Sequence, residues 1–164
     1  MGDIPGDEIW KQIDTCEYLY LQRLFEPHDN SLTIVLEEAI SNKINIQSGK
    51  KVLASLPEGL NEGDSWPIEH TPACRVFTLS WKNYISYCVT EEMHGSCGEY
   101  SDETFEGRLI RVYSKSHFLD FLSKDTGAHF QPFRHYKIAC LNHVIDIASE
   151  VQPVLELQPR FLLT

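Results

Sequence analysis

The clearest pattern in the sequence is an alternation of apolar and polar residues with a period of two between positions 77 and 89. The apolar residues at alternate positions are Phe77, Leu79, Trp81, Ile85, Tyr87 and Val89. This period is typical of a β-strand with one buried and one solvated face. The segment therefore predicts either one long strand over 75–91 or two strands separated by a tight turn at Lys82-Asn83.

Two further pairs of strand-like runs flank turn-forming residues. Residues 17–26 and 31–40 lie on either side of PHDN at 27–30, and residues 135–141 and 144–150 lie on either side of Asn142-His143. Short connections of this kind join antiparallel neighbours, so each pair predicts a hairpin. Residues 108–114 predict another strand, and the apolar tail after Pro153 predicts an edge strand.

One helix is predicted near 116–124, because Ser116 is a good N-cap and Gly127 follows the apolar stripe. The stripe consists of Phe118, Leu119, Phe121 and Leu122. A second short helical segment over 7–16 is indicated by the spacing of Trp10 and Ile13. We expect an α+β fold with a single domain over 1–164, dominated by an antiparallel β-sheet built from hairpins. Residues 1–16 and 156–164 are candidates for peripheral tails.

The charge balance limits the classes of partner. The chain has 164 residues with 14 Lys and Arg against 24 Asp and Glu, a formal net charge of −10. This balance argues against binding to nucleic acid, whose phosphates need clustered basic residues, and against an anionic membrane surface. A basic protein partner remains compatible with the charge, because complementary charge speeds encounter.

The start of the chain and the cysteines indicate the compartment. MGDIPGDEIW contains no cationic segment followed by an apolar run, so we expect no secretory signal. The chain has five cysteines, an odd number, of which Cys88 and Cys140 lie in strand-like runs. We expect mostly reduced thiols in a cytoplasmic protein.

The least ordinary feature is an acidic segment. Residues 83–107 contain six acidic residues and no Lys or Arg, whereas solvated loops usually mix the two signs. Tyr100 and Phe105 lie among these acids, like aromatic anchors within the polar rim of an interface. The alternative is a solvated hairpin tip with a chance excess of acids. The expected partner-binding residues are Glu91, Glu92, Glu99, Tyr100, Asp102, Glu103, Phe105 and Glu106.

A second hypothesis is a metal- or thiol-dependent enzyme. His94-Gly95-Ser96-Cys97 and Cys140-Leu141-Asn142-His143 supply two thiols and two imidazoles, which could bind zinc if they converged. However, Cys140 shares parity with Ile138 and is expected to point into the core. Acidic neighbours would raise the thiol pKa of Cys97, which disfavours a nucleophile. We therefore expect no metal, no cofactor and no catalytic residue.

Three segments of the chain carry a resemblance to a known group. They are FTLSWKNYISYCVTEE at 77–92, SKSHFLDFL at 114–122 and HYKIACLNHVIDIAS at 135–149. Together they resemble small uncharacterised bacterial proteins that behave like immunity proteins of toxin systems, over residues 17–155. The resemblance implies a cytoplasmic α+β protein without enzymatic activity that binds another protein. We therefore expect a stoichiometric binding protein that covers the basic cleft of a toxin through the acidic segment.

Overall fold

The computed structural model describes residues 7–41, 67–95, 100–125 and 133–158. Within these ranges the chain forms two five-stranded antiparallel sheets and two short helices, which confirms the expected strand-dominated α+β fold. In chain order the elements are α1 (Asp7–Asp14), β1 (Tyr18–Phe25), β2 (Leu32–Ser41), β3 (Ile68–Glu69), β4 (Val76–Trp81), β5 (Ser86–Glu91), a 3-10 helix (Glu92–His94), β6 (Thr104–Glu106), β7 (Ile110–Lys115), α3 (His117–Asp125), β8 (Arg134–Ala139), β9 (His143–Ser149) and β10 (Val154–Gln158).

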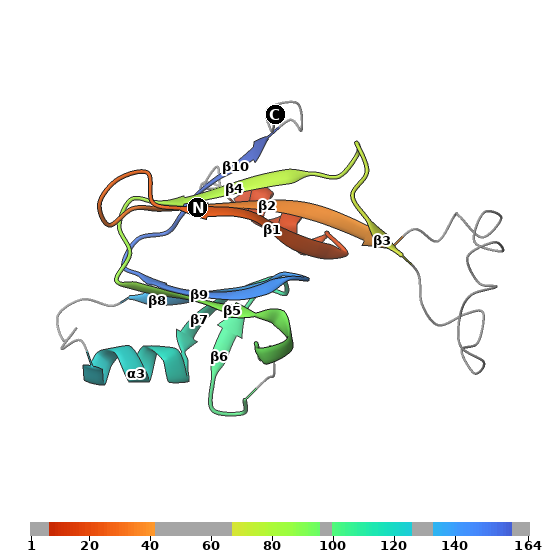
Figure 1. The fold of residues 1–164 in the computed structure, drawn as a ribbon. Coiled ribbons are helices and arrows are strands. Elements are labelled where there is room, and N and C mark those ends of the chain that lie inside the picture. Colours follow the sequence, from red (N-terminus) through yellow and green to blue (C-terminus); the bar gives the residue numbers. More distant parts are fainter. Residues whose placement is uncertain (1–6, 42–66, 96–99, 126–132, 159–164) are drawn as a thin grey trace.

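The two sheets lie face to face as two layers, and α3 lies on the outer side of the second layer (Figure 1). The first sheet has the order β1-β2-β4-β10, with β3 paired to β2, and the second has the order β5-β9-β8-β7-β6. The inner faces form one hydrophobic core. Trp81 of the first sheet meets Tyr136 of the second edge to face, with ring centroids 5.5 Å apart. The predicted edge strand after Pro153 is β10, which pairs with β4.

The alternating segment over 75–91 divides between the two layers. Its first part is β4 and its second is β5, and the two strands belong to different sheets. The prediction of one long strand is wrong. The alternative of two strands is correct, although residues 82–85 cross between the layers instead of forming a hairpin turn. Phe77, Leu79 and Trp81 of β4 lie in the core and Tyr87 of β5 packs against it with the same parity, whereas Val89 at the end of β5 is 40% exposed. The period alone could not reveal the crossing, because the parity continues through it.

Both predicted hairpins are present. β1 pairs antiparallel with β2, and the turn between them ends at Asn30, whose φ of 60° is one that asparagine tolerates. β8 pairs antiparallel with β9, with Ala139 opposite Val144. His143 is the first residue of β9 and not a turn residue.

The predicted helix near 116–124 is α3. The backbone N–H of Leu119 donates to Ser116 Oγ at 3.2 Å, which confirms Ser116 as the N-cap. Leu119 and Leu122 are buried as predicted. Phe121 is 58% exposed, because α3 lies on the outside of a sheet and buries only a narrow stripe.

Helix α1 is held on the first sheet by Arg75 and Glu38. The guanidinium donates to both carboxylate oxygens of Glu38, from Nε at 2.8 Å and from an Nη at 2.7 Å. Its other Nη donates to the carbonyl oxygen of Gln12 in α1 at 3.1 Å. These contacts lie beside Ile13, which is fully buried in the core, so the N-terminal segment contributes to the packing.

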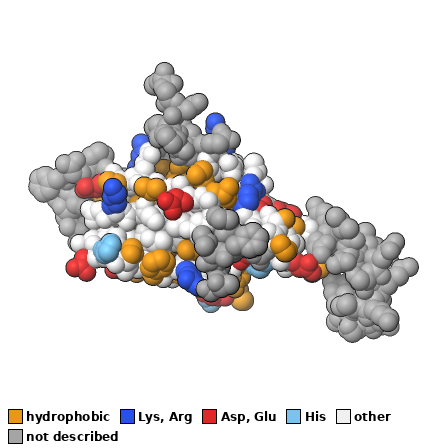
Figure 2. All heavy atoms as spheres, turned by 90° about the horizontal axis from the view of Figure 1, so that it is seen from above, with side chains coloured by type: hydrophobic (Ala, Val, Ile, Leu, Met, Phe, Trp, Pro, Cys, Tyr) orange, Lys and Arg blue, Asp and Glu red, His pale blue; other side chains and the backbone are white. Residues whose placement is uncertain are grey.

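The outside of the first sheet carries a mixed surface. Viewed from above, basic, acidic and hydrophobic side chains are interspersed over it (Figure 2). None of the helices in the described ranges is long and apolar enough to cross a membrane. Of the cysteines that the structure describes, Cys16, Cys74 and Cys140 are buried and Cys88 is exposed.

We predict that Glu38→Gln lowers the free energy of unfolding by about 2 kcal/mol at neutral pH, because it removes a charge-assisted bidentate contact from a mostly buried position. Hydrogen bonding to Arg75 lowers the pKa of Glu38 below its ordinary value of 4.5. The stabilisation is therefore present above that value and is lost as the pH falls through the lowered pKa. Urea unfolding at several pH values measures both effects.

The matched control is Glu156→Gln, which alters an exposed carboxylate on β10 and should change stability by less than about 0.5 kcal/mol. Equal stabilities of Glu38→Gln and the wild type at neutral pH would contradict the assigned role of this ion pair.

Candidate functional site

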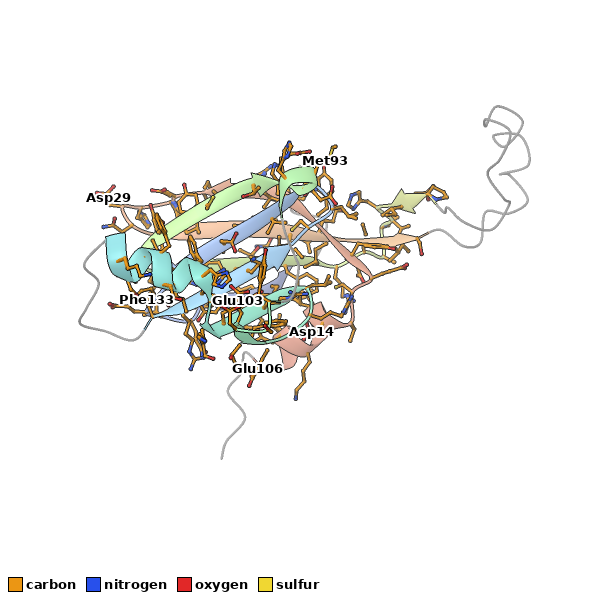
Figure 3. All side chains as sticks on the ribbon, turned by 90° about the horizontal axis from the view of Figure 1, so that it is seen from below. Asp14, Asp29, Met93, Glu103, Glu106 and Phe133 are labelled. Carbon is orange, nitrogen blue, oxygen red and sulfur yellow. The ribbon has the colours of Figure 1, made fainter. Side chains whose placement is uncertain are left out.

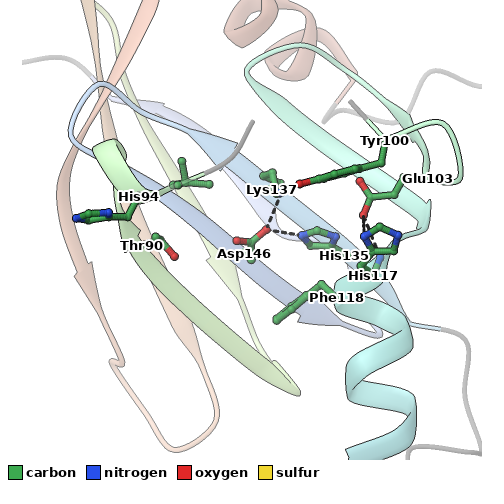
Figure 4. Close-up of a pocket in the computed structure, with 11 residues that line it drawn as sticks. Thr90, His94, Tyr100, Glu103, His117, Phe118, His135, Lys137 and Asp146 are labelled. Carbon is green, nitrogen blue, oxygen red and sulfur yellow. Dashed lines mark hydrogen bonds and ion pairs between the residues drawn. The ribbon is translucent and has the colours of Figure 1, made fainter. Parts of the chain in front are cut away.

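A pocket of about 320 Å³ lies on the outer face of the second sheet. Lys137 and Asp146 form the floor of this pocket. Because side chains alternate along a strand and the neighbouring Ile138 and Ile145 point into the core, Lys137 and Asp146 point outward. Figure 3 views the molecule from below, on the side where α3 lies. The polar residues lining the pocket include Thr90, Tyr100, Glu103, His117, Lys137 and Asp146 (Figure 4).

The deepest part of the site is a chain of hydrogen bonds through His135. His135 Nε2 lies 2.7 Å from Asp146 Oδ1, and His135 Nδ1 lies 2.9 Å from Ser116 Oγ. Ser116 Oγ also accepts the N–H of Leu119. Every group is satisfied if the serine hydroxyl donates to Nδ1 and the protonated Nε2 donates to the carboxylate. The histidine thus joins the start of α3 to the strand that carries Asp146.

This serine, histidine and aspartate do not form a hydrolytic triad. Ser116 is 1% exposed and does not line the pocket, and its hydroxyl oxygen accepts the N–H of Leu119 as the cap of α3. His135 is also enclosed by rings, with Tyr113 stacked at 4.5 Å between centroids and Phe118 at 4.9 Å. This hydrogen-bonded chain therefore orients Asp146 and anchors α3, and of its three members His135 and Asp146 line the pocket while Ser116 does not.

Lys137 partly balances Asp146. Its Nζ lies 3.6 Å from Asp146 Oδ1, and the two residues are directly opposite each other on β8 and β9. Both side chains are largely buried, so this attraction is screened less than a surface pair would be. Since His135 and Lys137 both approach Oδ1, the second oxygen, Oδ2, can accept from a ligand.

Glu103 and His117 line the side of the pocket next to α3, and Asp102 contacts His117 there. Glu103 Oε1 accepts the backbone N–H of His117 at 2.9 Å, which satisfies a free donor at the start of the helix. His117 Nε2 lies 2.8 Å from Asp102 Oδ2. This hydrogen bond raises the pKa of His117 and lowers the pKa of Asp102. The pair therefore retains its opposite charges over a wider pH range than two isolated groups would.

One carboxylate oxygen on this side of the pocket has no partner. The Glu103 side chain is 5% exposed, and its Oε2 is buried with no hydrogen-bond partner in the described part of the chain. A buried polar atom without a partner is costly and is one of the signals of a site completed by another molecule.

The predicted partner-binding residues are distributed around this pocket. Tyr100 and Glu103 line it, and Glu91 and Glu92 lie between the lining residues Thr90 and His94. Asp102 contacts His117 beside it, and Glu106 is exposed at the end of β6. Glu99 lies outside the described residues.

Phe105 differs from the expected free anchor. Its ring packs on Tyr113 with centroids 4.9 Å apart, and the Arg111 guanidinium lies 4.5 Å from the ring centroid on the same strand as Tyr113. Arg111 and Lys115 come from β7, which pairs with β6. The acidic segment therefore has basic neighbours in space that the sequence run did not show.

The residues of the enzyme hypothesis do not lie together as far as the structure describes them. His94 is 82% exposed and lines the pocket on the outer face, whereas Cys140 belongs to the core. His143 lies at the start of β9, and Cys97 is outside the described residues. Among the described residues, no three His, Cys, Asp or Glu side chains are placed to hold a metal ion.

We predict that Ser116→Ala lowers the free energy of unfolding by about 1–2 kcal/mol, because it removes the N-cap of α3 and leaves His135 Nδ1 without its partner. Denaturant unfolding measures this change. Ser114→Ala, at an exposed hydroxyl on β7, is the matched control and should alter stability by less than about 0.5 kcal/mol. Covalent labelling of Ser116 in the folded protein by a serine-directed reagent would show that the hydroxyl is accessible and overturn its structural role.

Comparison of the chain with models of known protein families, with curated proteins and with solved structures gives no match. Function is therefore inferred from the pocket and from the charges around it.

Proposed function

We propose that this protein is a non-enzymatic binding protein that recognises a basic protein partner through the pocket on the outer face of its second sheet. The observation that carries the proposal is that carboxylates both line the pocket and border it. Glu103 and Asp146 line it, and Glu91 and Glu92 are exposed and follow the lining residue Thr90 in the chain. We call these four residues the carboxylate rim.

The edge of the pocket also offers apolar contact surface. Met93, between Glu92 and His94 in the 3-10 helix, is 82% exposed, and Tyr100 is half exposed on the opposite loop. Figure 3 shows Met93 at one end of this face and Glu103 nearer α3. Methionine and tyrosine are enriched in protein interfaces, where charged residues surround a few apolar anchors. Sequence reasoning identified Tyr100 but missed Met93.

The net charge of the chain and the carboxylates of the pocket favour a basic partner. The chain carries a net charge of −10, and Lys137, the basic residue lining the pocket, is already next to Asp146. A positively charged cleft would be attracted at a distance and then covered by the rim. In the class that the sequence resembles, such binding inhibits a toxin by occlusion, and we propose an immunity-type inhibitor of this kind.

We predict that Glu91→Lys/Glu92→Lys slows association with the basic partner about tenfold and flattens its salt dependence, because both substitutions reverse charges that steer the encounter. Both side chains are exposed. Asp102 and Glu103 are unsuitable for charge reversal, since their contacts hold His117 and the start of α3.

The experiment is affinity capture of a basic partner from lysate of the source organism, followed by association kinetics at about 50 mM and about 500 mM salt. Glu150→Lys/Glu156→Lys makes the same change in net charge at two exposed positions away from the pocket and should bind nearly as the wild type does. The proposal fails if no basic protein is captured, or if the two double variants associate equally fast.

A further inference from the structure

Among the ion pairs at the pocket and beside it, the one made by Glu103 is the longest. Three carboxylates, Asp102, Glu103 and Asp146, face two groups that can be cationic, His117 and Lys137. His117 is nearer to Asp102, at 2.8 Å, than to Glu103, at 3.9 Å.

Glu103 also has a carboxylate oxygen without a partner among the described residues. Its Oε1 is occupied by the backbone N–H of His117, and its Oε2 has no partner within the described ranges although the side chain is 5% exposed. Burying a charged oxygen in this way is unfavourable unless a donor completes its hydrogen bonding. The natural complement is a cation that carries N–H donors.

The dimensions and walls of the pocket narrow the choice of cation. A volume of about 320 Å³ accommodates a side-chain-sized group and is far larger than a single metal ion requires. Tyr100, which is half exposed, and Phe118 supply aromatic surface in the same lining. A planar guanidinium can stack on a ring and donate to two carboxylates at once, whereas an ammonium group is compact and strongly hydrated.

We propose that the pocket binds the guanidinium group of an arginine side chain, which donates to Glu103 Oε2 and to Asp146 Oδ2 with Tyr100 against its face (Figure 4). This inference rests on the proposed function, because it names the part of the basic partner that enters the pocket. Asp146 is held ready for this contact by His135, and Lys137 approaches it through the other oxygen. Arginine is also a frequent hot-spot residue in interfaces.

The test uses arginine amide as the probe, titrated into the whole protein and followed by amide chemical shifts. We expect shifts centred on Tyr100, Lys137 and Asp146 with a dissociation constant on the order of 1 mM. Citrulline amide, which has nearly the same shape without the charge, should not bind, and lysine amide should bind several-fold more weakly.

Glu103→Gln should weaken arginine amide binding about tenfold or more, because the amide keeps an acceptor for the His117 N–H but replaces the unpaired anionic oxygen with a donor. Glu106→Gln is the matched control, at an exposed carboxylate that does not line the pocket, and should bind as the wild type does. If Glu103→Gln does not fold, Asp146→Asn takes its place, since its amide oxygen can still accept from His135.

The inference is overturned if arginine amide shifts no pocket amide, if citrulline amide binds equally well, or if neither pocket substitution weakens binding. Failure of the inference is distinguishable from failure of the proposed function. A basic partner that binds Glu103→Gln as tightly as the wild type would retain the function and exclude the arginine contact. Arginine amide binding without capture of any basic protein would retain the pocket and exclude the function.

Discussion

The packing of the two sheets against each other determines which residues of the second sheet can form a site. Tyr136, Ile138, Ile145 and Ile147 fill the space beneath the first sheet, and Tyr136 meets Trp81 across the interface. Because side chains alternate along a strand, burying these residues turns His135, Lys137 and Asp146 to the opposite face. Any change that shifted the register by one residue would bury the charges and abolish the pocket.

The outer face becomes a specific surface because a buried polar network holds α3 on it. His135 bonds to Ser116 at the start of the helix and to Asp146 on β9, so one side chain fixes both the helix and the carboxylate. Glu103 adds a second connection by accepting the first backbone N–H of α3. A network whose members are all satisfied gives a unique arrangement, and a member left unsatisfied indicates where another molecule fits. Both ring nitrogens of His135 have partners, whereas Glu103 Oε2 has none in the described part of the chain.

The fold could be predicted from the sequence further than the site. Turn residues and parity were enough for both hairpins, for the inward direction of Cys140 and for the N-cap at Ser116, since each is a local property. The same alternation places Lys137 and Asp146 on the outer face, so the direction of these two pocket residues could be predicted from the hairpin.

The rest of the site depends on contacts that are distant in sequence. The crossing of β4 and β5 between layers leaves the period unchanged, and nothing local indicates that α3 lies over β8. The acids at 102, 103 and 106 looked uniform in the sequence. In space Asp102 is exposed with a histidine partner, the side chain of Glu103 is buried at a helix start, and Glu106 is exposed on the strand that pairs with β7. The charge run in the sequence lies close to the pocket, but it does not show which carboxylate oxygen is left without a partner among the residues that the structure describes.

The most direct measurement is a crystal structure of the full chain grown with arginine amide. The account predicts a guanidinium in the pocket on the outer face of the second sheet, within hydrogen-bonding distance of Glu103 Oε2 and on the Oδ2 side of Asp146. A pocket that stays empty at saturating arginine amide, or a Glu103 whose second oxygen is bonded to another part of the same chain, would contradict it.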